Sequence, residues 1–150
     1  MAQIMNTTAV RGFEHPSQSR IFDAFIPFVG RVLLSAIFLA SGIGKLEAPA
    51  DTIGYIASEG LPFPALAYAA AVVIELVGGF TLAVGFRTRI TAAALAIFSL
   101  ATAVCFHSNL ADLNQFIHFF KNVAMAGGLL QIVAFGAGAF SLDAYRGRSK

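Results

Sequence analysis

The chain has 150 residues, of which 57% are hydrophobic and only 12% are charged, and its mean hydropathy is +0.76. Soluble domains are about 45–50% apolar and about 25% charged, so this composition excludes an ordinary water-soluble domain. The net charge of +2 comes from scattered basic residues, which do not indicate nucleic-acid binding, and the single cysteine, Cys105, excludes an intrachain disulfide or a CxxC motif.

The N-terminal region is polar as far as Arg20, and no small-residue cleavage site follows a short apolar core. We therefore expect residues 1–19 to form a flexible cytoplasmic tail, and we expect no removable signal peptide.

Four long apolar stretches follow this tail, at about residues 21–43, 66–86, 90–106 and 116–140. A helix that crosses a bilayer needs about 20 apolar residues at a rise of 1.5 Å each. The predicted fold class is therefore all-α. Residues 20–143 are expected to form a polytopic membrane domain, a four-transmembrane-helix bundle, and residues 144–150 a cytoplasmic C-terminal tail.

The connections between these stretches support the same order. The short "FRTR" segment predicts a tight turn between the second and third helices, which makes them antiparallel neighbours. The connection over residues 45–64 is longer and contains three prolines together with apolar residues. It predicts a short interfacial helix at about residues 51–58 that ends at Gly60.

Basic residues gather on the side of the membrane that would hold both termini. That side receives Arg11, Arg20, Arg87, Arg89, Arg146, Arg148 and Lys150. The opposite connections contain Lys45 as their basic residue, together with the acidic residues Glu47, Asp51, Glu59 and Asp112. By the positive-inside rule we expect a multi-pass protein of the bacterial inner membrane with both termini in the cytoplasm.

Glu75 lies eleven residues after Pro64 and therefore near the middle of the second predicted span. A carboxylate there costs about 2.5 kcal/mol or more, so it should face the bundle interior and have a partner, or carry a proton. Helical rise places Arg31 and Glu75 at roughly similar depths, about 21 and 16 Å below the outer edge. We expect Glu75 to pair with Arg31, with Lys121 as a second cation. Two interpretations stay open, a structural ion pair and a proton-carrying or ligand-binding carboxylate.

The last predicted span begins with a polar stripe. Gln115, His118 and Asn122 recur at i, i+3 and i+7 and share one helix face, with Lys121 at its edge. His107 ends the preceding span on the same side of the membrane, so the two histidines can line one opening and exchange protons near neutral pH. The alternative for each is an interfacial histidine that bonds to headgroups or loop carbonyls. The spacing matches no known zinc pattern, so we predict no metal site.

The segment "SGIGKL", residues 41–46, lacks the spacing of a phosphate-binding loop. We expect its lysine, Lys45, to reach the outer headgroups or to turn toward Glu47 or Asp51. The 15 phenylalanines could line a quinone pocket, but most are expected to face lipid.

Several motifs, in order, resemble the DoxX family of small bacterial membrane proteins. They are Arg31 and the segments "FLASGIGKLEAP", "GYIASEGLPFP", "IELVGGFTLAVGFRTR" and "FIHFFKNVAMAGGLL". The resemblance covers about residues 31–143 and implies a four-helix inner-membrane protein, often linked to redox systems. Related DoxD-type proteins form a subunit of a thiosulfate:quinone oxidoreductase. The sequence contains no recognisable redox-cysteine, haem, flavin or iron–sulfur motif, so the resemblance supports fold and location more than an activity.

The leading hypothesis is a subunit or accessory protein of a quinone- or sulfur-linked membrane redox system, with a quinone as the cofactor. Glu75 and His118 would move protons, as the catalytic pair. The substrate-binding residues would be Arg31, Lys121, Asn122, Lys45 and His107. Membrane lipid and a second copy or another redox subunit are the expected partners. The alternatives are a small-molecule carrier with an ion-coupled site, and a scaffold whose polar pairs only fix helix packing.

Overall fold

The computed structural model describes residues 16–148, which form six helices. They are α1 (Pro16–Glu47), α2 (Pro49–Ser58), α3 (Pro64–Val84), α4 (Thr88–Phe106), α5 (Leu113–Phe135) and α6 (Leu142–Arg148). Residues 22–47 of α1, together with α3, α4 and α5, are long and apolar enough to cross a membrane. The predicted all-α class with four spans is confirmed. Most of the predicted N-terminal tail, residues 1–15, lies outside the described residues, and its last four residues belong to α1.

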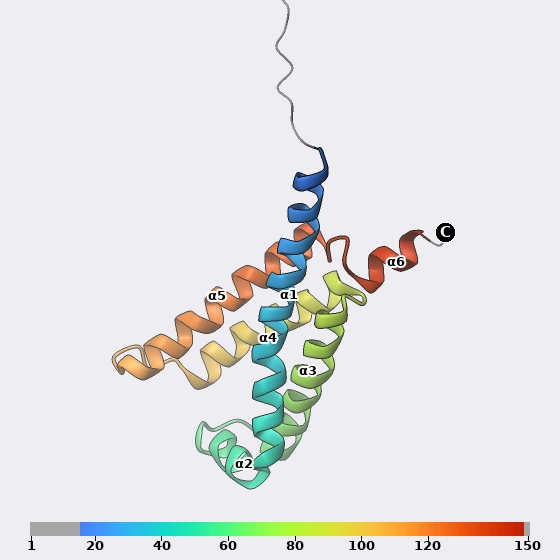
Figure 1. The fold of residues 1–150 in the computed structure, drawn as a ribbon. Helices are drawn as coiled ribbons and strands as arrows, with labels where there is room; N and C mark the ends of the chain where they lie inside the picture. The colour runs from blue at the N-terminus through green and yellow to red at the C-terminus, as the bar shows by residue number, and fades with distance from the viewer. Residues whose placement is uncertain (1–15, 149–150) are drawn as a thin grey trace, which may run out of the picture.

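The four long helices form two antiparallel pairs. α1 packs along α3, and α4 packs along α5, while α1 and α5 make few contacts. Figure 1 shows the pairs as two arms that come together near α6 and diverge toward the end where α2 lies. The two helices of each pair therefore stabilise one another. Side chains of α1 to α5 line the region where the two pairs diverge.

Small residues allow the helices to approach closely. A Cβ atom added at Gly42 of α1 would lie 2.7 Å from Leu76 Cδ2 of α3, and one added at Gly79 of α3 would lie 3.0 Å from Leu39 Cγ of α1. Buried leucines and alanines of α3, α4 and α5 form the core with Phe38. Because lipid is as apolar as leucine, this close packing is what holds membrane helices together.

Two helices end earlier than the sequence predicts, and glycine is the reason in both. α3 ends at Val84 because Gly85 adopts a left-handed conformation with φ 72°, and the Phe86 N–H then donates to the Thr81 carbonyl. α5 ends at Phe135, five residues before its predicted end, because Gly136 has φ 86°. A positive φ at these positions is incompatible with a continuing right-handed helix.

Residues 144–148 of the predicted C-terminal tail belong to α6, whose start bonds to the turn between α3 and α4 through the Asp143 N–H and the Gly85 carbonyl. Its Asp143 carboxylate accepts hydrogen bonds from the Arg87 N–H (2.8 Å), the Thr88 N–H (2.8 Å) and the Thr88 hydroxyl (2.7 Å). Burial alone would raise the pKa of Asp143, but these bonds and the charge of Arg146 hold it below its usual range. Asp143 thus caps the N-terminus of α4 from a distant part of the chain.

Candidate functional site

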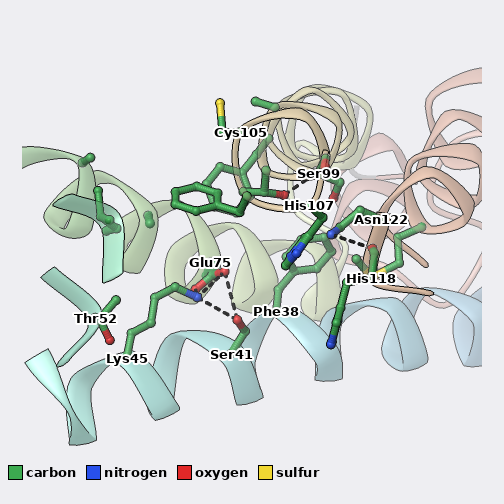
Figure 2. A pocket seen from close by; sticks show the side chains of 18 of the residues that line it. Phe38, Ser41, Lys45, Thr52, Glu75, Ser99, Cys105, His107, His118 and Asn122 are labelled. Atoms are coloured by element: carbon green, nitrogen blue, oxygen red, sulfur yellow. Dashed lines mark hydrogen bonds and ion pairs between the residues drawn. The ribbon is translucent and has the colours of Figure 1, made fainter. Parts of the chain in front are cut away.

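A cavity of about 440 Å³ lies between the two helix pairs and α2. Its apolar walls include Phe38, Phe98 and Met125. Of the seven residues that the sequence analysis predicts to be catalytic or substrate-binding, six line this cavity, namely Lys45, Glu75, His107, His118, Lys121 and Asn122. Figure 2 shows Ser41, Lys45 and Glu75 grouped on one side, and His107, His118 and Asn122 grouped on the other. The cavity therefore combines an apolar body with polar groups contributed by both helix pairs.

Lys45 and Glu75 form an ion pair between α1 and α3. The Lys45 Nζ atom lies 2.9 Å from Glu75 Oε1 and 2.8 Å from Oε2, and the Ser41 hydroxyl donates to Oε1 at 3.1 Å. Ser41 and Lys45 are four residues apart and so share one face of α1. Glu75 is only 5% exposed, whereas the Lys45 side chain is 24% exposed. The carboxylate is thus buried but compensated, as its position in the membrane requires.

The predicted pairing of Glu75 with Arg31 is wrong. The Arg31 guanidinium donates to three backbone carbonyls instead. It bonds to Ala83 at 3.3 Å, to Phe140 at 2.7 Å and to Ala137. These carbonyls belong to the end of α3 and to the segment between α5 and α6, where helix ends carry partial negative charge. Arg31 is 1% exposed and does not line this cavity, so it lies apart from the other residues that the sequence predicts to bind substrate.

Two further expectations about the cations are also corrected. Lys45 does not extend to the headgroups or to Glu47 or Asp51, because it turns inward to Glu75. Lys121 is not a second partner of Glu75, because the hydrogen bond described for its Nζ atom goes to His118 Nδ1 at 2.9 Å.

The two histidines lie together, and the prediction that they line one opening is confirmed. The rings of His107 and His118 are stacked, with centroids 5.0 Å apart and planes 23° apart. His107 Nδ1 lies 2.7 Å from the Gln115 side-chain oxygen, so this nitrogen is the donor. His118 Nδ1 faces the Lys121 ammonium and therefore accepts. The Asn122 amide donates to the His118 backbone carbonyl at 3.1 Å.

Polar residues that the sequence did not nominate also line the cavity, namely Ser41, Thr52, Tyr55, Ser99, Thr102 and Cys105. Tyr55 connects α2 to the end of α4, because its hydroxyl donates to the Phe106 carbonyl at 3.4 Å and its ring contacts the Phe106 ring. Burial, and next the charge of Glu59, raises the pKa of Tyr55. Ser41 lies four residues before Lys45 and so on the same helix face, and this spacing was the signal that could have predicted Ser41 as a lining residue. Within the described part of the chain, no group of three or more His, Cys, Asp or Glu side chains is placed to hold a metal ion.

Comparison with known proteins decides the family, since the DoxX family profile matches residues 26–108, more than half of the chain. The chain belongs to the DoxX family. It is 37% identical over 115 residues to the inner membrane protein YqjF of Escherichia coli (strain K12), which covers 77% of this chain and 87% of YqjF. It is 36% identical over 121 residues to the inner membrane protein YphA of the same organism, which covers 77% of this chain and 86% of YphA. No solved structure matches.

This DoxX-family chain is a multi-pass inner membrane protein with four candidate spans, as the sequence predicts. The region matched to the family profile includes Lys45, Glu75 and His107. His118, Lys121 and Asn122 lie beyond that region, in α5.

Proposed function

We propose that this DoxX-family protein is a subunit or accessory protein of a quinone- or sulfur-linked redox system and that its cavity binds a quinone. The observation that carries the proposal is the cavity of about 440 Å³ with polar groups on two sides and apolar walls between. Small-molecule sites have this form, mostly apolar with a few polar groups that fix orientation. A flat ring with oxygens on opposite edges suits such a cavity.

The residues on each side of the cavity have distinct tasks in this proposal. Lys121 donates to the ring oxygen on one side. On the other side the Lys45 ammonium, which bonds to Ser41 and to both Glu75 oxygens, supplies positive charge near the second ring oxygen. Phe38, Phe98 and Met125 cover the ring and exclude water from it. A bound quinone would supply the redox chemistry, since two electrons and two protons convert it to a quinol.

Glu75 and His118 are the proton carriers in this proposal. Glu75 is fixed by Lys45 and Ser41, so its carboxylate has a defined position at the cavity. The His118 ring accepts a hydrogen bond from Lys121, which gives a proton a direct path between the two side chains. The two electrons are delivered by a partner subunit that carries a redox centre.

Both termini lie in the cytoplasm in this proposal. The distribution of basic residues supports this orientation, and Figure 1 shows the start of α1 and α6 at the same end of the molecule. The cavity, which lies toward α2, is then nearer the periplasmic face, and the bilayer lipid surrounds the exposed apolar side chains of the four spans.

Thermal unfolding of the purified protein in nanodiscs tests the proposal. A short-chain benzoquinone at about 100 times its Kd should stabilise the wild type by about 2.7 kcal/mol and raise its Tm. The shift should be smaller in Glu75→Gln and unchanged in the matched control Glu47→Gln, because Glu47 does not line the cavity. If neither benzoquinones nor naphthoquinones shift the Tm of the wild type, the proposal is wrong.

One observation favours a second candidate, a small-molecule carrier. The cavity lies toward one end of the molecule, whereas Arg31 and Asp143 tie helices and carbonyls together at the other end. Carriers open such a site to each side of the membrane in turn. Flux of a cavity ligand into proteoliposomes that contain no redox partner would support a carrier. Binding without flux would support the redox accessory.

A further inference from the structure

The charges that line the cavity do not balance. Lys45, Glu75 and Lys121 are its charged residues, and both histidines are counted as neutral. The lining then carries one positive charge, because two lysines face one carboxylate. The carboxylates of the adjoining segments, Asp51, Glu59 and Asp112, do not line the cavity. Asp112 is engaged elsewhere, since its Oδ1 atom accepts the Gln115 N–H at 2.9 Å as the N-cap of α5.

Lys121 is the cation that lacks a counter-ion in this cavity. The hydrogen bond described for its Nζ atom goes to His118 Nδ1, and that nitrogen must accept because an ammonium group only donates. An accepting imidazole takes one of three N–H groups and neutralises no charge. Glu75 is already bound through both oxygens by Lys45, and this is the one salt bridge among the described residues. Lys121 is an exposed side chain of this lining, so its remaining N–H groups are accessible to a ligand.

We propose that the ligand of this cavity carries a negatively charged oxygen on an apolar body and that Lys121 binds this oxygen. Because His118 Nδ1 accepts from Lys121, the proton of its neutral ring lies on Nε2, which is a further donor for the same oxygen. The ring of His107, whose Nδ1 donates to Gln115, stacks against His118 and holds it in place. Phe38, Phe98 and Met125 cover the apolar body. The class of ligand is therefore an aromatic oxyanion, either a carboxylate or a phenolate. The inference depends on the proposed function only for the cavity, since an anionic hydroxyquinone and an aromatic carboxylate both belong to this class.

Three probes separate the charge of the ligand from its redox chemistry. They are 2-hydroxy-1,4-naphthoquinone, which is ionised at neutral pH, its neutral 2-methoxy analogue, and 2-naphthoate, which is an anion but no quinone. Their affinities are measured by calorimetric titration of the protein in phosphatidylcholine nanodiscs at pH 7. We expect both anions to bind at least about tenfold more tightly than the methoxy compound, since a charge-assisted hydrogen bond has about this effect.

The outcomes distinguish this inference from the proposed function. Equal affinity for the two quinones overturns the inference and leaves the proposed function standing. Binding of 2-naphthoate but of neither quinone supports the inference and overturns the proposed function. No binding of any probe overturns both. If phosphatidylglycerol added to the nanodiscs displaces the anionic probes, the natural ligand is a lipid headgroup and the assignment to a small aromatic acid is wrong.

Substitution of Lys121 locates the anion. Lys121→Met should weaken the binding of both anions about tenfold and change that of the methoxy compound less than twofold, while Lys121→Arg should keep the preference. Arg146→Met is the control for loss of a positive charge elsewhere, because Arg146 lies against Phe86 outside the cavity. An anion preference that survives Lys121→Met, or that Arg146→Met reduces equally, contradicts the assignment of the oxyanion to Lys121.

Discussion

Lys45→Met should destabilise the bundle, because it leaves the buried Glu75 carboxylate without a cation. Removing one partner of a buried ion pair costs about 3–5 kcal/mol. The Glu75 side chain is 6% exposed but that of Lys45 is 24% exposed, so water reaches the pair and the lower value applies. The Ser41 hydroxyl still donates to Glu75, which offsets about 1 kcal/mol. We therefore expect a loss of about 2–3 kcal/mol in the free energy of unfolding.

Removing both charges should restore most of this loss. The variant Lys45→Met with Glu75→Met replaces the pair by side chains of similar length and leaves no buried charge, so its stability should lie within about 1 kcal/mol of the wild type. The matched control combines Arg31→Met with Glu75→Met. Because these two side chains bond to different groups, their effects should add to within about 0.5 kcal/mol.

The measurement is unfolding by sodium dodecyl sulfate in mixed micelles, followed by far-ultraviolet circular dichroism. The reasoning is refuted if Lys45→Met costs less than about 1 kcal/mol or if the double variant is no more stable than Lys45→Met alone. The double variant also separates structure from function. If it folds and still binds the quinone, the pair only fixes packing, as in the scaffold alternative. If it folds and does not bind, Glu75 belongs to the binding site.

The remaining predictions concern the caps and contacts of the helices. Asp143→Asn should cost about 1 kcal/mol at pH 7, since Asp143 caps α4 through Thr88. Because the folded pKa of Asp143 is lowered, its stabilisation is present above the ordinary value of about 3.9 and disappears as pH falls through the lower folded value. Unfolding of wild type and variant should therefore converge only below about pH 4. Gly42→Ala should destabilise by about 1–3 kcal/mol through overlap with Leu76, whereas Gly44→Ala, which meets nothing within 4 Å, should be neutral or stabilising in the same assay.

The sequence alone determined the features that depend on one helix at a time. In hydrocarbon each span must satisfy its backbone hydrogen bonds internally, so the length of an apolar stretch is enough to predict a helix. The polar stripe of α5 follows from residue spacing, because residues three, four and seven positions apart share one face of a helix. His118, Lys121 and Asn122 do line the cavity. The short helix over residues 51–58 was also predicted, and α2 extends it by two residues.

Only the tertiary structure decided which charged groups meet. Helical rise gives the depth of Glu75 and Arg31, but not how the helices are rotated or how the two pairs diverge. Arg31 donates instead to backbone carbonyls that the turns at Gly85 and Gly136 place next to it. Gly42 lets α3 approach α1 closely enough for Lys45 to turn inward to Glu75. From a buried charge in the sequence we can predict that it has a partner, but the close packing between helices determines which group that partner is.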